Sequence, residues 1–129
     1  MQRKEKQSPK EMAVIEKASE LMRGCFEIGD DDIPTAAFGT ELLGGMALTI
    51  YQNLIRADEC GMASDEARHE RQFYQREAIV GCRVLIGVLE TAAFIPETVD
   101  IHKKTEEVLC MTASWKNKER RQAALQGGA

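Results

Sequence analysis

Apolar residues recur along this chain at steps of three and four, the spacing that places side chains on one face of an α-helix. The first apolar stripe extends from Met12 to Cys25. It follows Ser8 and Pro9, and a serine cap followed by a first-turn proline is typical of a helix start, so we predict a helix from about Pro9. Gly24 stands where such a helix could end, and residues 1–8 are expected to form a flexible basic tail.

The segment after this helix is rich in turn-forming residues. Residues 25–33 alternate between apolar and polar around a turn-rich centre, a pattern that fits a small β-hairpin or a simple loop. A second helix is predicted from about Pro34, with an apolar stripe from Phe38 to Leu54. Gly61 is the expected stop of that helix.

The most apolar part of the chain is the run from Ala78 to Ile95, within a third predicted helix that starts at about Asp65. As a helix this run carries two stripes, one of Ala78, Cys82, Leu85, Leu89 and Ala92, and another of Val80, Val84 and Val88. One small core cannot easily cover both stripes, so either the helix is packed on two sides or its second stripe awaits a partner chain. The run is also rich in β-branched residues, which leaves open a buried strand within residues 78–89.

A last amphipathic helix is predicted after Pro96, with a stripe from Ile101 to Trp115 and a basic end. Residues 126–129 are expected to be a frayed tail. We therefore predict a mainly α, compact single domain of about four helices over residues 9–125, with the small β-hairpin near residues 25–33 as an addition. The alternative is an α+β fold with a buried strand within residues 78–89.

Composition and charge narrow the classes of function. A chain of 129 residues can form the core of one domain without metals or disulfides. With 17 basic and 21 acidic side chains the net charge is −4, which gives nucleic acid no overall electrostatic attraction. Arg83 and Glu90 interrupt the apolar run, as they would rarely do in a membrane-spanning helix, and the N-terminal residues lack the apolar stretch of a secretory signal. We expect a soluble, cytoplasmic protein with no nucleic-acid partner and no membrane insertion.

Residues that could carry catalytic chemistry are few. Glu66 and His69 have the Glu-x-x-His spacing of helical di-iron sites, but such a site needs a second copy of the motif, and His102 has Val99 at the matching position. The four cysteines never form a Cys-x-x-Cys pair. A solvated charged face that includes Arg71 is the simpler interpretation of this segment. We expect no enzyme activity, metal or cofactor, and a metal-dependent helical enzyme that uses Glu66 and His69 is the enzymatic alternative.

The second apolar stripe favours a protein that binds a partner. We predict an interface formed by Val80, Val84 and Val88, extended by Ile95. The partner would offer a helical or peptide segment, and both homo- and hetero-oligomers are compatible with the pattern.

Several short strings, taken in order, resemble the landmarks of one protein family. They are Phe26 with the Gly29–Asp32 turn, Leu42-Leu43, Cys60-Gly61-Met62-Ala63 before Asp65-Glu66, Ala78-Ile79-Val80-Gly81-Cys82-Arg83-Val84, and Leu109-Cys110-Met111-Thr112. This series resembles the IcmS family, small acidic chaperones or adaptors of Dot/Icm type IVB secretion systems. The chain departs from the family in the charged residues 67–75 and in a longer stretch between Val84 and Leu109. The resemblance implies no catalysis, and it implies pairing with an IcmW-like subunit, docking on the coupling ATPase and holding effectors ready for export.

A second likeness is to TraM-type antiactivators, helical proteins that sequester a transcription regulator. It rests on Ile15-Glu16-Lys17-Ala18 with Glu20-Leu21, and on Phe94-Ile95-Pro96. These strings are generic helix and helix-end sequence, so we rank this interpretation below the secretion adaptor.

Overall fold

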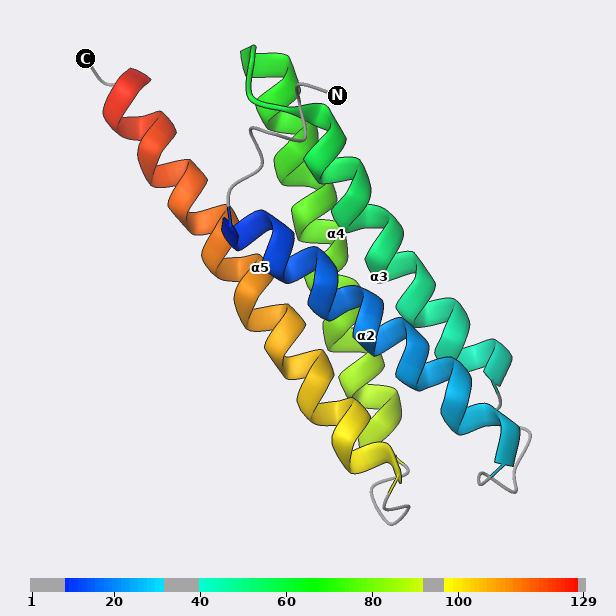
Figure 1. Cartoon of the computed structure of the whole chain (residues 1–129). Helices are drawn as coiled ribbons and strands as arrows, with labels where there is room; N and C mark the ends of the chain where they lie inside the picture. Colours follow the sequence, from blue (N-terminus) through cyan, green and yellow to red (C-terminus); the bar gives the residue numbers. More distant parts are fainter. Residues whose placement is uncertain (1–8, 32–39, 92–96, 128–129) are drawn as a thin grey trace.

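The computed structural model describes residues 9–31, 40–91 and 97–127, and every element in these ranges is an α-helix. The helices are α2 (Pro9–Asp31), α3 (Thr40–Cys60), α4 (Asp65–Glu90) and α5 (Glu97–Gly127). Successive helices run in opposite directions, and each packs mainly against two others, in the order α2, α3, α4, α5 and back to α2 (Figure 1). This arrangement is an up-down-up-down four-helix bundle, so the predicted mainly α fold of about four helices is confirmed.

The core consists of side chains that recur every three and four residues in each helix. It includes Ala78, Cys82, Leu85 and Leu89 of α4 and Ile101, Val108 and Trp115 of α5. Because the pattern repeats every seven residues, one line along each helix faces its neighbours, as in coiled coils. The first stripe predicted for the apolar run is therefore the core stripe of α4, and Ala92 lies outside the described residues.

The connection between α3 and α4 follows the turn chemistry that the sequence predicts. Gly61, after the last residue of α3, has a φ of 71°, a conformation that glycine adopts without strain. The Ser64 hydroxyl accepts a hydrogen bond of 3.0 Å from the backbone N–H of Ala67 and so caps α4. Asp65 and Glu66 lie in the first turn, where the helix dipole favours negative charge. The predicted stop at Gly61 and start at Asp65 are both confirmed.

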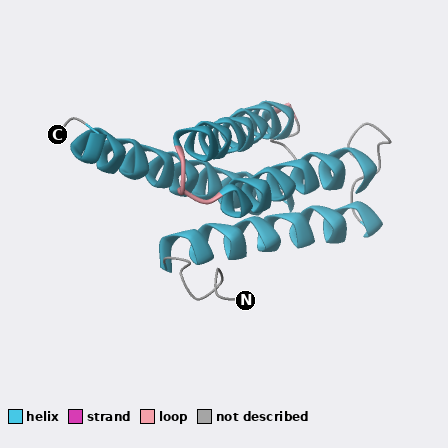
Figure 2. Cartoon of the chain, turned by 90° about the horizontal axis from the view of Figure 1, so that it is seen from above, coloured by secondary structure: helices cyan, strands magenta, loops and turns pink. Residues whose placement is uncertain are grey.

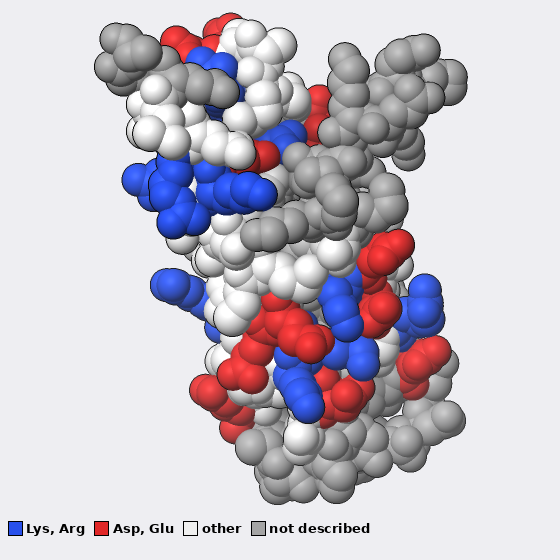
Figure 3. Space-filling model, turned by 60° about the vertical axis from the view of Figure 1, so that its left-hand side comes forward, with Lys and Arg blue, Asp and Glu red and all other residues white. Residues whose placement is uncertain are grey.

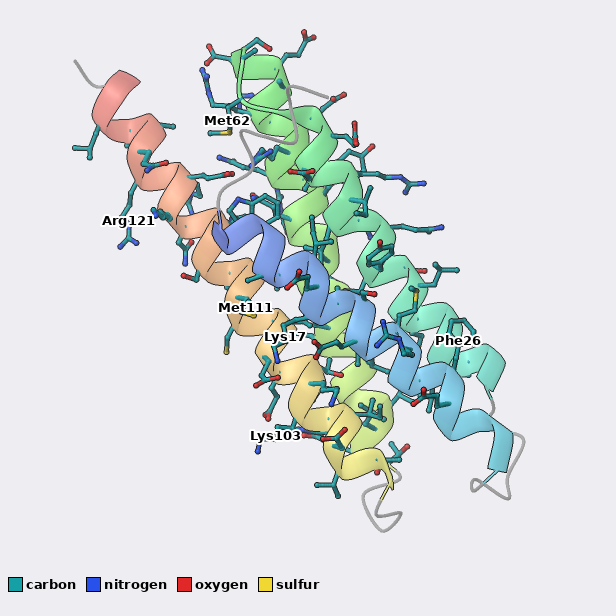
Figure 4. All side chains as sticks on the ribbon, in the orientation of Figure 1. Lys17, Phe26, Met62, Lys103, Met111 and Arg121 are labelled. Atoms are coloured by element: carbon teal, nitrogen blue, oxygen red, sulfur yellow. The ribbon has the colours of Figure 1, made fainter. Side chains whose placement is uncertain are left out.

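The β-hairpin predicted near residues 25–33 is wrong for the part that the structure describes, because α2 continues to Asp31. Gly24 lies inside this helix, and an added Cβ there would lie 2.8 Å from Ile101 Cδ1. The glycine thus permits the close approach of α5 and does not end the helix. The Phe26 side chain projects toward α3, where it covers Gly44 (Figure 4). Residues 32–33 and the predicted helix start at Pro34 lie outside the described residues.

The alternative of a buried strand within residues 78–89 is also wrong, because α4 is one continuous helix of 26 residues. Figure 2, a view from above, shows helices and the α3–α4 loop, with no strand in the described part of the chain. The β-branched residues of this run lie mainly at exposed or half-buried positions, while Ala78, Cys82, Leu85 and Leu89 fill the core. Burial of a stripe with helical spacing therefore outweighs the β propensity of the run.

Candidate functional site

The predicted partner-binding residues fall on different parts of α4. Val80 and Val84 lie on its outer face, with exposed fractions of 49% and 51%. Val88 differs, because it is half-buried and packs against the core. Ile95 lies outside the described residues. The structure therefore brings together two of the four predicted residues on an open surface.

Phe73 belongs to the same outer face and was not predicted. It lies seven residues before Val80, two helical turns along α4, and its side chain is 50% exposed. Its ring meets the edge of the Tyr74 ring at a centroid distance of 5.3 Å. We call Phe73, Val80 and Val84 the α4 outer face. The seven-residue spacing is a sequence signal for Phe73, but it lies in a charged segment before the apolar run.

Basic side chains border the α4 outer face on the side of α5. Arg76 and Arg83 are exposed and lie three residues after Phe73 and Val80, respectively, so each is a neighbour of one apolar residue on the helix surface. On α5, burial and then the charges of Arg120 and Arg76 lower the pKa of the Lys116 ammonium group. We call Arg76, Arg83, Lys116 and Arg120 the basic edge.

The distribution of charge over this side of the molecule is uneven. Figure 3 shows Lys and Arg side chains gathered in its upper left part, whereas Asp and Glu intermix with them in the lower half. Ion pairs of the described residues join Lys104 with Asp100 at 2.9 Å and Lys17 with Glu107 at 3.8 Å. Among the described residues, no carboxylate forms an ion pair with a member of the basic edge. The basic edge is thus an unneutralised border beside apolar surface.

A buried charged cluster lies on the inner side of the same helix. The Arg71 guanidinium donates hydrogen bonds to both carboxylate oxygens of Glu119 on α5, the shortest at 2.7 Å from Nη2. The same carboxylate accepts hydrogen bonds from Trp115 Nε1 at 2.7 Å and from Gln75 Nε2 at 3.1 Å. Arg71 also donates to the backbone carbonyl of Ala57 on α3 and lies 4.8 Å from the centre of the Trp115 ring. Three helices therefore meet at one compensated charge pair.

The sequence interpretation of Arg71 as part of a solvated face is wrong, because its residue exposure is 3%. A signal was present: Arg71 lies seven residues before Ala78, and Glu119 lies seven residues after Thr112, so both continue the core repeat of their helices. In the described part of the chain, no group donates a hydrogen bond to the buried Gln75 Oε1. Within the cluster, the charges of Arg71 and Glu119 compensate each other.

The residues considered for metal chemistry are not assembled into a site in the described part of the chain. Glu66 and His69 are both exposed near the start of α4, and no group of three or more His, Cys, Asp or Glu side chains that could hold a metal ion is found among the described residues. All four cysteines are free thiols. Burial raises the pKa of Cys25 and of Cys82 to about 12, so these two thiols stay protonated, whereas Cys110 is exposed.

A hollow of about 390 Å³ lies between α4 and α5 at the opposite end of the bundle from the charged cluster. Leu89, Thr98 and Val99 form part of its lining, and His102 lies at its border. The His102 ring is engaged on both sides, with Nε2 3.5 Å from Glu90 and Nδ1 3.6 Å from Glu106. The hollow is mainly apolar.

Comparison with known proteins adds no identification: no protein-family model matches the chain, and no curated protein or solved structure does. The resemblance to the IcmS family therefore rests on the sequence strings alone. Among the described helices, none is both long and apolar enough to cross a membrane.

Proposed function

We propose that this chain is a small non-enzymatic protein that binds a partner protein through the α4 outer face. The observation that carries the proposal is the alignment of Phe73, Val80 and Val84, each about half exposed, along one side of a single helix. Single exposed apolar residues are ordinary, but a line of them at helical spacing is typical of a surface that packs against another chain. None of these three side chains belongs to the buried core of the bundle.

The more specific form of the proposal is a secretion adaptor. The strings shared with the IcmS family support it, and they would give the chain an IcmW-like subunit and a coupling ATPase as partners and exported effectors as cargo. The departure at residues 67–75 coincides with the first half of α4, where Arg71 and Gln75 enter the buried charged cluster. A TraM-type antiactivator, which would sequester a transcription regulator, is the alternative that the same experiment distinguishes.

The test is an affinity capture of the tagged chain from its native cells, with mass spectrometry of the proteins that co-elute at near-stoichiometric yield. Wild type is compared with Val84→Asp and with Val99→Asp, a matched control on α5 whose valine is 61% exposed. We expect Val84→Asp to lower recovery of the partner about ten-fold or more, because a charge would enter the apolar contact, and Val99→Asp to leave it unchanged.

The identity of the captured protein then separates the candidates. Secretion-system subunits or exported proteins would support the adaptor, and a transcription regulator would support the antiactivator. Circular dichroism and size-exclusion chromatography must show that both variants remain folded. Equal recovery with wild type and with folded Val84→Asp would contradict binding through the α4 outer face.

A further inference from the structure

The basic edge gives one margin of the α4 outer face a positive charge, which the apolar residues alone do not provide. Phe73, Val80 and Val84 lie along the middle of the surface, with the exposed Glu77 between Phe73 and Val80, and Arg76 and Arg83 follow one side of it. The two arginines are seven residues apart on one helix, a separation of about 10 Å. Lys116 and Arg120 continue the same side onto α5. A partner that covers the apolar middle must therefore face a row of cations along one margin.

A helix laid along α4 matches this row in spacing. Its own residues seven apart repeat at the same distance of about 10 Å, so two carboxylates on one edge of such a helix would meet both arginines together. Its aliphatic residues at steps of three and four would meet Val80 and Val84. Because no described carboxylate is paired with these arginines, the partner would not have to displace one.

Two other occupants fit less well. Antiparallel packing of two copies of α4 about Val80 would place the same margins together, so the arginine row of one copy would face that of the other. A phosphate backbone would match the cations but leave the apolar middle uncovered, and the chain as a whole carries a net charge of −4.

We propose that the α4 outer face binds an acidic amphipathic helix of a partner protein, with carboxylates of that helix on Arg76 and Arg83. The proposal rests on the proposed function, because it names the chemistry of the partner at that same surface. It predicts binding that weakens with salt, since the margin of the contact is electrostatic.

The experiment is site-specific photo-crosslinking in the native cells with the full chain, in which Phe73 is replaced by the photoreactive p-benzoylphenylalanine. This position is half exposed and already aromatic, so the probe suits it. We expect mass spectrometry to identify a cross-linked segment of another protein that has an aliphatic helical stripe and acidic residues along one edge. A cross-link to nucleic acid, to a second copy of this chain or to a segment without acidic residues would overturn the proposal.

Three variants of this chain separate the two levels of the argument. Arg76→Glu combined with Arg83→Glu should lower the cross-link yield about ten-fold, and raising the salt of a lysate from about 50 mM to about 500 mM should do the same to wild type. Arg23→Glu combined with Lys103→Glu changes the net charge equally at exposed positions away from the surface, and should leave the yield unchanged. If Val84→Asp lowers the yield but the arginine pair does not, the partner is apolar and the acidic partner is overturned while the proposed function stands. If neither Val84→Asp nor the arginine pair lowers the cross-link yield, or if the folded protein forms no cross-link, then both the acidic partner and the proposed function are overturned.

Discussion

Arg71 and Glu119 occupy positions of the seven-residue repeat that mostly apolar side chains fill in the rest of the bundle. Their side chains are 4% and 10% exposed, and the carboxylate accepts hydrogen bonds from Arg71, Gln75 and Trp115. Removing one member leaves a buried charge without compensation, whereas replacing both by apolar side chains removes the problem. We therefore predict that Glu119→Ala lowers the free energy of unfolding by about 3–5 kcal/mol, and that Arg71→Met with Glu119→Leu recovers most of the loss.

Urea unfolding followed by circular dichroism measures these changes, and the fluorescence of Trp115, the one tryptophan of the chain, gives a second signal inside the cluster. Glu107→Ala is the control: its side chain is 47% exposed and 3.8 Å from Lys17, so we expect a loss of less than about 0.5 kcal/mol. A loss of under about 1 kcal/mol for Glu119→Ala would show that the pair does not carry the burial cost inferred from the geometry.

At the same scale, the sequence indicated where these two residues lie but not that they meet. The repeat places Arg71 and Glu119 on the core side of their helices, yet a charged residue is normally assigned to solvent. Arg71 and Glu119 are 48 residues apart along the chain, so their contact becomes apparent only once α4 and α5 are packed together. The half-burial of Val88 was not visible in the sequence for a related reason, because it depends on how the neighbouring helix is placed.

At the scale of the helix, the space around the glycines of α4 shows how closely neighbouring helices approach it. An added Cβ at Gly81 would lie 2.9 Å from Cγ1 of the fully buried Ile50, whereas Gly87 has no atom within 4 Å of the same position. We predict that Gly87→Ala stabilises the protein by about 0.5–1 kcal/mol through helix propensity. Gly81→Ala gains the same propensity but forces α3 and α4 apart, so we expect it to be about 1 kcal/mol or more less stable than Gly87→Ala. Urea unfolding of the two variants gives the comparison, and equal stabilities would contradict close α3–α4 packing.

Helix boundaries were predictable where local chemistry sets them and unpredictable where packing does. Gly61 and Ser64 act through their own backbone and hydroxyl, so the end of α3 and the start of α4 could be read from the sequence. Gly24 has the same appearance as a helix stop, but its surroundings include Ile101 of α5, and the helix continues through it. Whether a glycine ends a helix or admits a neighbour is decided by contacts distant in sequence.

At the scale of the whole molecule, α5 extends past the start of α2. Ala13, near the start of α2, lines a hollow together with Cys110 and Ser114, so the last turns of α5 have no described part of α2 beside them (Figure 1). The apolar spacing predicted the helices and one shared core, because each has a single buried stripe. It could not predict which helices would be neighbours or how far α5 would extend.

Two truncations test how much of this extension the bundle needs. After Gln122, Ala123 is half-buried, Ala124 is exposed, and Leu125 is 80% exposed. A chain ending at Gln122 keeps Glu119 and most of a helical turn after it, so we expect its free energy of unfolding to lie within about 1 kcal/mol of the full chain. A chain ending at Lys118 loses the carboxylate that compensates Arg71 and should be less stable by about 3 kcal/mol or more. Urea unfolding of both decides the matter, since a large loss already at Gln122 would mean that the end of α5 stabilises the bundle directly.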